Sequence, residues 1–200
     1  MSLDLVVYVP GIGGNHLKNL LCLSASYSNS SDLRPEVYEN PDPKRPPGEV
    51  WCVGGRNLQD VFFDRMQQEP NHSWVLPAHF GEMCEYAPKL DAIPNKKMIV
   101  ISMEDQASRR KLDQRQQRLG QCIHPYWLDE ELIHVYRPEV LSKIFQHDPS
   151  QYMSLNIKDF WHKDFVSSDV FAQLKQFLNI ELSNDTAQRY HHLWINANNL

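Results

Sequence analysis

Apolar residues along this chain fall into short runs that are separated by polar and amphipathic stretches. Residues 5–9 and 98–102 are nearly continuous apolar runs, which are typical of strands buried on both faces of a parallel sheet. Shorter strands are predicted at residues 49–53, 74–80 and 152–157. The pattern therefore predicts a sheet whose central strands are covered on both sides.

Between the strands, apolar residues recur at helical spacing. Residues 16–23 form one such segment, and residues 58–68 place Leu58, Val61, Phe62 and Met66 on one helix face. Further helices are expected at residues 106–118, 138–145 and 170–178, and Ser183 can cap a final helix that runs through residue 196. Because strands alternate with helices, we expect an α/β fold, a three-layer sandwich around a mainly parallel central sheet.

The composition narrows the classes of protein to which this chain can belong. Its 200 residues are 42% hydrophobic, which suits a single domain over residues 1–200. A formal net charge of -5 argues against a general nucleic-acid binder, because such proteins need a broad basic surface. No run approaches the roughly 18 apolar residues that cross a bilayer, and the first residues lack the pattern of a signal peptide. We therefore expect a cytoplasmic protein without a membrane or nucleic-acid partner.

Cysteines and histidines show no metal-binding pattern. The four cysteines, Cys22, Cys52, Cys84 and Cys122, are far apart and include no CxxC pair, so we expect them to be reduced and buried. A helical stripe formed by His191, His192 and Trp194 is expected to be a packed face rather than a ligand set. We expect no metal.

A glycine-rich turn between the first strand and the first helix is the most informative segment. Residues 10–15 contain Gly11, Gly13 and Gly14, which let backbone amides converge without interference from Cβ atoms. The unpaired amides and positive dipole end of the following helix, with Asn15 expected as its N-cap, would favour an anion there. Alternatively, the glycines serve only the geometry of a strand-to-helix turn.

Three familiar glycine motifs do not fit this turn. The dinucleotide-binding fingerprint needs a third glycine where this chain has His16. The nucleoside-triphosphate loop needs Gly-Lys-Ser/Thr at the helix start, whereas here Gly14 is followed by Asn15 and His16. In α/β hydrolases a Gly-rich turn after a strand often supplies the oxyanion hole, but those enzymes also need a GxSxG serine elbow, and the sequence contains none.

Residues 9–17, Val-Pro-Gly-Ile-Gly-Gly-Asn-His-Leu, resemble the strand-turn-helix of the sulfotransferases, in which this loop binds the 5′-phosphosulfate of the donor PAPS. Residues 75–80 look like the family strand that ends in Lys-Thr-His, and residues 94–101 look like its next strand. Residues 155–160 and 171–182 are similar to the C-terminal part of the family. The resemblance implies a P-loop-like, sulfotransferase-like fold and transfer of a sulfuryl group from PAPS to the hydroxyl of a small molecule or glycan.

The resemblance also implies roles for individual residues. His79, at the end of its strand, corresponds to the catalytic histidine of the family, and an ordinary imidazole pKa of about 6.5 suits removal of a proton from the acceptor. Alternatively, His79 is bonded to a neighbouring backbone group. The donor would be held by residues of the turn and the first helix, and by Ser108, Arg109 and Arg110 in place of the Arg and Ser that bind the 3′-phosphate in the family. The turn and helix residues in this set are Gly11, Gly13, Gly14, Asn15, His16 and Lys18.

Several positions depart from the family pattern. Gly11, Pro77 and Met103 stand where the family has cations. Lys18 could bend back toward an anion or lie on the surface, and Arg109 and Arg110 could instead belong to a solvated helix face. These departures leave open a second hypothesis, a non-catalytic binding or structural module that keeps the sheet and the turn. The segments 27–48 and 126–136 are the expected walls of an acceptor pocket.

Overall fold

Four parallel strands form the centre of the protein in a computed structural model that describes residues 2–9, 12–28, 59–103, 106–118 and 130–198. They are β1 (Ser2–Tyr8), β2 (Ser73–Ala78), β3 (Asn95–Ser102) and β4 (Tyr152–Asn156), in the spatial order β2-β1-β3-β4. Val7 of β1 lies between Ala78 of β2 and Val100 of β3. The all-parallel arrangement confirms the sequence-based expectation for the sheet.

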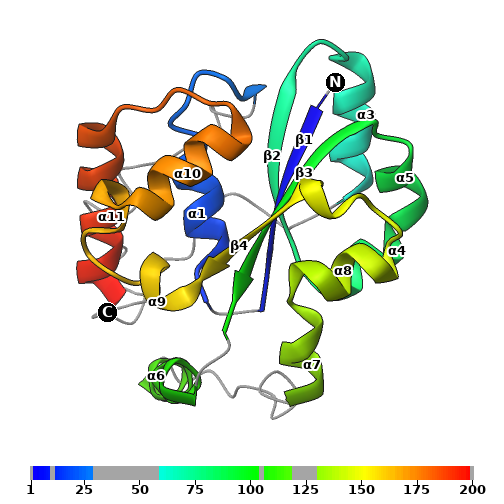
Figure 1. Cartoon of the computed structure of the whole chain (residues 1–200). Coiled ribbons are helices and arrows are strands. Elements are labelled where there is room, and N and C mark those ends of the chain that lie inside the picture. The colour runs from blue at the N-terminus through cyan, green and yellow to red at the C-terminus, as the bar shows by residue number, and fades with distance from the viewer. Residues whose placement is uncertain (1, 10–11, 29–58, 104–105, 119–129, 199–200) are drawn as a thin grey trace.

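Helices cover both faces of this sheet (Figure 1). One face carries α1 (Gly14–Leu21), α9 (Ile157–Phe160), α10 (Asp169–Leu178) and α11 (Asn184–Asn198). The other face carries α3 (Asp60–Gln68), α4 (Phe80–Glu85), α5 (Ala87–Asp91) and α8 (Pro138–Ile144). The predicted three-layer α/β sandwich is therefore present.

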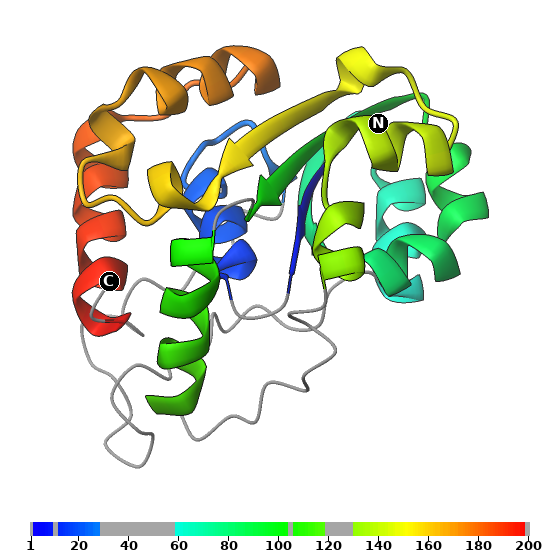
Figure 2. The ribbon, with the colours of Figure 1, turned by 60° about the horizontal axis from the view of Figure 1, so that its bottom comes forward.

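Two further helices lie beyond the carboxyl ends of the strands. Figure 2, in which the bottom of the first view comes forward, shows α6 (Gln106–Arg118) and α7 (Glu130–Val135) on this side of the sheet. We call the side on which the strands end the carboxyl edge, and the side on which they begin the amino edge. Short 3-10 helices at Pro149–Gln151, which precedes β4, and at Phe165–Ser167 complete the described elements.

Burial follows from this layering. In β1 every residue from Leu3 to Tyr8 is buried, so the strand shows no alternation between an inner and an outer face. Double-sided burial explains why the run reads as continuously apolar in the sequence. The exception is Asp4, a carboxylic acid that is only 7% exposed inside the same strand.

Three sequence predictions need correction here. The strand expected at residues 74–80 ends at Ala78, because His79 caps α4 and Phe80 is its first residue. Val61, which was predicted to lie on the buried face of α3, is 52% exposed. Phe63 is buried instead, because the face of α3 that packs against the core carries Phe63 and Met66. Cys84 is exposed, whereas Cys22 is buried as expected.

Short helices escaped prediction because four to six residues are too few to show helical periodicity. These are α4, α5, α7 and α9. Several predictions fall outside the described residues and are not tested by the structure. They concern the strand at residues 49–53, Leu58, Cys52, Cys122 and most of the two expected pocket segments. Within the described part of the chain, every helix is too short or too polar to cross a membrane.

Candidate functional site

The glycine turn lies at the carboxyl edge, directly between β1 and α1. Gly13 is the N-cap of α1 and adopts a left-handed conformation with φ of 97°, which favours glycine. The first intrahelical bond runs from the Leu17 amide to the Gly13 carbonyl at 3.1 Å. The N-cap is therefore Gly13 rather than Asn15, which lies in the first turn because the helix begins at Gly14, two residues earlier than the sequence suggested.

Tight packing gives Gly13 and Gly14, the two glycines of the turn that the structure describes, a steric role. A Cβ on Gly13 would lie 2.6 Å from Cζ2 of Trp194, and a Cβ on Gly14 would lie 2.1 Å from Cδ1 of Tyr8. Neither approach is tolerable for a side chain. Turn geometry and packing alone therefore account for these two glycines, while Gly11 lies outside the described residues.

A tryptophan from the far end of the chain holds the turn in place. The indole Nε1 of Trp161, which follows α9, donates a hydrogen bond to the Ile12 carbonyl at 3.0 Å. The ammonium of Lys111 lies 5.5 Å from the centre of the Trp161 ring, a cation–π distance. Lys111 is thus a cation near the turn. The sequence analysis did not single out Lys111, because only its long-range contact with Trp161 reveals its position.

His16 points away from solvent into the helical layer. Its ring is fully buried and stacks on Trp194, with centroids 4.2 Å apart and planes 3° from parallel. His191 donates from Nε2 to the His162 carbonyl at 3.0 Å, so its Nδ1 accepts from Nε2 of His16 at 3.2 Å. Burial lowers the pKa of His16 well below its usual value. The His16 side chain therefore packs inside the helical layer, and only the His16 backbone amide lies in the first turn of α1.

Lys18 is also buried, with 3% of its surface exposed. The alternative that placed it on the surface is wrong, because α1 is covered along its length by α11 and the sheet. His191 and Trp194 belong to the packed face predicted for the final helix.

His79 occupies the neighbouring strand end, next to the turn. Its Nδ1 donates a hydrogen bond of 2.9 Å to the Tyr8 carbonyl, and its backbone amide donates to Oε2 of Glu82 at 2.7 Å. Since Nδ1 carries the hydrogen, the neutral ring has its lone pair on Nε2. The sequence analysis gave such a bond to a neighbouring backbone group as the alternative to a catalytic role for His79. The same bond also fixes the tautomer that a general base requires.

Partial burial keeps the His79 ring neutral. Removal from water lowers its pKa, and the Tyr8 carbonyl and the Glu82 carboxylate oppose this effect only in part. The Tyr8 ring packs against the imidazole, with centroids 4.4 Å apart. A neutral imidazole with a fixed tautomer can accept a proton at Nε2 near pH 7.

The remaining candidates lie on α6, beyond the carboxyl ends of the strands (Figure 2). Ser108 is 6% exposed, Arg109 is half-buried and Arg110 is exposed. Arg110 therefore belongs to the solvated face that was the alternative for this helix, while Ser108 and Arg109 face the protein. Met103, immediately after β3, is 1% exposed.

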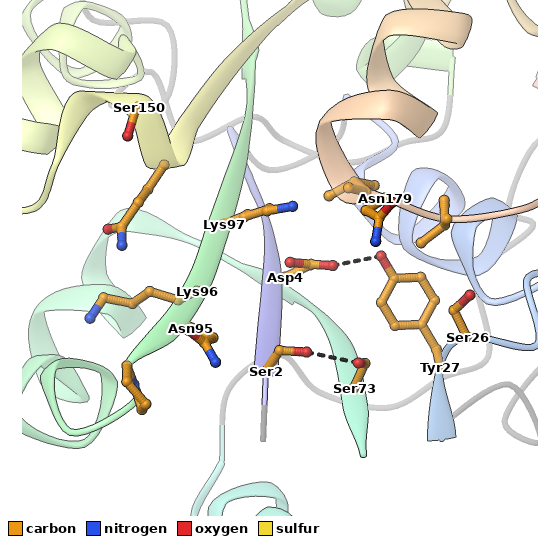
Figure 3. A pocket seen from close by; sticks show the side chains of 14 residues that line it. Ser2, Asp4, Ser26, Tyr27, Ser73, Asn95, Lys96, Lys97, Ser150 and Asn179 are labelled. Atoms are coloured by element: carbon orange, nitrogen blue, oxygen red, sulfur yellow. Dashed lines mark hydrogen bonds between the residues drawn. The ribbon is translucent and has the colours of Figure 1, made fainter. Parts of the chain in front are cut away.

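A second set of polar residues lies at the opposite, amino edge and was missed by the sequence analysis. A cavity of about 490 Å³ there is lined by residues that include Asp4, Tyr27 and Lys97 (Figure 3). The only sequence signal was an acidic residue inside an apolar strand, since its partners come from distant segments. In the described residues, no group of three or more His, Cys, Asp or Glu side chains could hold a metal ion.

In comparisons with known proteins, no family model and no curated protein sequence matches this chain.

Proposed function

We propose that the carboxyl edge binds a 3′-phosphoadenylyl nucleotide and transfers the sulfuryl group of PAPS to a hydroxyl acceptor, within a sulfotransferase-like version of the α/β sandwich. The observation that carries the proposal is the junction at Tyr8. Its carbonyl holds the His79 ring, and its own ring covers Gly14 at the start of α1. A neutral base and a helix N-terminus thus meet at the ends of two adjacent parallel strands, where open α/β sheets bind ligands.

Donor binding would rest mainly on backbone groups. The amides of Gly13, Gly14, Asn15 and His16 in and before the first turn of α1, together with Gly11, would hold the 5′-phosphate at the positive end of the helix dipole. Ser108 and Arg109, with Arg110 at the exposed side, would hold the 3′-phosphate from α6. Lys111 over Trp161 offers a further cation, which could offset the absence of a lysine at position 11.

The chemistry would be an in-line displacement. The acceptor oxygen forms a bond to sulfur while the bond between sulfur and the donor phosphate oxygen breaks, and adenosine 3′,5′-bisphosphate leaves. The acceptor proton goes to Nε2 of His79, which carries the lone pair because Nδ1 is bound to the Tyr8 carbonyl. Positioning and charge stabilisation would supply the remaining catalysis, as in phosphoryl transfer.

One observation favours the second hypothesis, a module that binds without catalysis. Met103 and Pro77 are buried apolar residues at places where the sulfotransferases have cations. Without these charges the site would hold a nucleotide less tightly and stabilise less of the charge that develops during transfer. Both hypotheses use the same turn, so they differ in turnover rather than in where the nucleotide binds.

Two measurements separate these possibilities. A thermal shift with millimolar adenosine 3′,5′-bisphosphate should raise the melting temperature more than adenosine 5′-monophosphate does, because ligands of the native state stabilise it. Sulfuryl transfer from PAPS to a panel of phenols and sugars should then be lost in His79→Ala and retained in the matched control His72→Ala, an exposed histidine before β2. No stabilisation would exclude the enzyme and a module that binds this nucleotide, and would leave only a structural module. Stabilisation without turnover would leave the binding module.

A further inference from the structure

The amino edge of the sheet carries a cavity that the proposed function does not use. It lies where β1, β2 and β3 begin, and it is closed on one side by Tyr27 and on another by the turn after α10 (Figure 3). Its volume of about 490 Å³ falls in the range of roughly 300–1,000 Å³ typical of small-molecule sites. The glycine turn and His79 lie at the carboxyl edge, so this cavity and the proposed nucleotide site are at opposite ends of the strands.

Two opposite charges stand side by side in the wall of this cavity. Asp4 of β1 and Lys97 of β3 are register partners on adjacent strands, so both side chains project from the same face of the sheet. Figure 3 shows the two side chains reaching toward the same part of the cavity, near Asn179. Yet the described residues contain no ion pair between them, since a different partner holds each group.

Neighbouring groups hold these charges apart. Oδ2 of Asp4 accepts a hydrogen bond of 2.7 Å from the Tyr27 hydroxyl. The Lys97 ammonium donates to the Phe177 carbonyl at 2.5 Å and lies 5.5 Å from the centre of the Phe177 ring. A carboxylate accepts about four hydrogen bonds and an ammonium donates three, so each group keeps capacity for a ligand.

The carboxylate is held there at a cost in stability. Asp4 is 7% exposed, and burial raises its pKa to about 6 although the Tyr27 hydroxyl and Lys97 act in the opposite direction. Buried charges are rare in proteins unless they are paired. The Asp4 carboxylate thus lies next to the Lys97 ammonium, which bonds to the Phe177 carbonyl instead. This arrangement fits a site in which a bound ligand supplies the opposite charge for Asp4.

We propose that this cavity binds a small zwitterion, a free α-amino acid with an apolar side chain. The ligand ammonium would pair with Asp4 and the ligand carboxylate with Lys97. Leu178 and Ile180, which line the cavity beside these charges, would contact the side chain. A zwitterion can pair with both Asp4 and Lys97, whereas a simple cation could pair only with Asp4 and a simple anion only with Lys97.

Matched ligands test the proposal on the unaltered protein. L-leucine, L-valine and L-methionine are titrated at up to millimolar concentration by ligand-observed NMR, and so are 3-methylbutylamine and 4-methylpentanoate, the leucine analogues that lack one charge. Because each analogue lacks one of the two charge-assisted hydrogen bonds, it should bind about tenfold or more weaker than L-leucine. Absence of binding by all three amino acids, or equal binding by either analogue, would overturn the proposal.

Variants then assign the two charges. Asp4→Asn, which can still accept from Tyr27, and Lys97→Met should each weaken binding of the amino acid about tenfold or more. Glu139→Gln and Lys143→Met make the same chemical changes at exposed positions of α8 and should leave binding unchanged. Unchanged binding in folded Asp4→Asn would contradict the proposal, and if that variant fails to fold, the comparison of ligands on the unaltered protein still decides.

Discussion

The His79 imidazole is tied to the Tyr8 carbonyl by a hydrogen bond of 2.9 Å that joins the ends of β2 and β1. The Tyr8 carbonyl accepts the hydrogen bond from His79, and the Tyr8 ring packs so closely on Gly14 that no Cβ would fit there. The geometry of the base and the geometry of the turn are therefore coupled through one residue. A change at Gly14 should be felt at His79, although the two residues come from different elements.

Gly14→Ala tests this coupling. The added Cβ would lie 2.1 Å from the Tyr8 ring, so the ring or α1 must shift, and we expect a loss of about 1–3 kcal/mol or more in the free energy of unfolding. Gly81→Ala in α4 is the control, because its Cβ would meet nothing within 4 Å and alanine favours a helix. Urea denaturation measures both, and equal stabilities of the two variants would refute the steric role of Gly14. The imidazole NMR signals of His79 should move in Gly14→Ala and stay in place in Gly81→Ala.

Much of this coupling is beyond the reach of sequence patterns. The apolar runs predicted the parallel strands because residues 5–9 and 98–102 are buried on both faces, which local composition records. The burial of His16 was not predictable, because Trp194 and His191 come from the other end of the chain. The cavity beside Asp4 was missed for the same reason, since its register partner Lys97 and its hydrogen-bond partner Tyr27 are set by the fold.

Asp4→Asn should stabilise the protein above pH 6. The folded-state pKa of about 6 exceeds the ordinary value of 3.8, so the folded state binds this proton more tightly than the unfolded state does. The resulting stability is present below pH 3.8 and is lost as the pH rises through 6. At pH 8 the variant should gain up to about 3 kcal/mol in the free energy of unfolding, and at pH 3.5 almost nothing.

Chemical denaturation across this pH range measures the effect. Asp64→Asn, at an exposed position of α3, is the control and should change little at any pH. A variant that is less stable than the unaltered protein at pH 8 would mean that the Asp4 carboxylate is well compensated in the folded state.

His16 of α1 and His191 of α11, whose rings are hydrogen-bonded, should make stability depend on pH in the direction opposite to Asp4. Burial lowers the pKa of His191 to about 4 and lowers that of His16 well below its usual value, so the unfolded state binds these protons more tightly. Stability is therefore complete above about pH 6.5 and falls as the pH drops toward 4. His191→Gln should remove up to about 3 kcal/mol of this acid-dependent loss while His16 retains its own part. An unaltered pH dependence in the variant would show that His191 is not held neutral, and His72→Ala, an exposed histidine, serves as the control.

The indole of Trp161 offers the sharpest test of what holds the glycine turn, because a second buried tryptophan provides a matched control. Trp161→Phe deletes the bond from Nε1 to the Ile12 carbonyl, whereas Nε1 of Trp74 has no hydrogen-bond partner in the part of the chain that the structure describes. Both substitutions remove similar volume from buried sites. We expect Trp161→Phe to lower the free energy of unfolding by about 1–3 kcal/mol more than Trp74→Phe, since it leaves a buried carbonyl without its donor. Amide hydrogen exchange should also quicken in the first turn of α1 only in Trp161→Phe. Equal losses in the two variants would show that the turn is held by packing against Trp194 and Tyr8 rather than by this hydrogen bond.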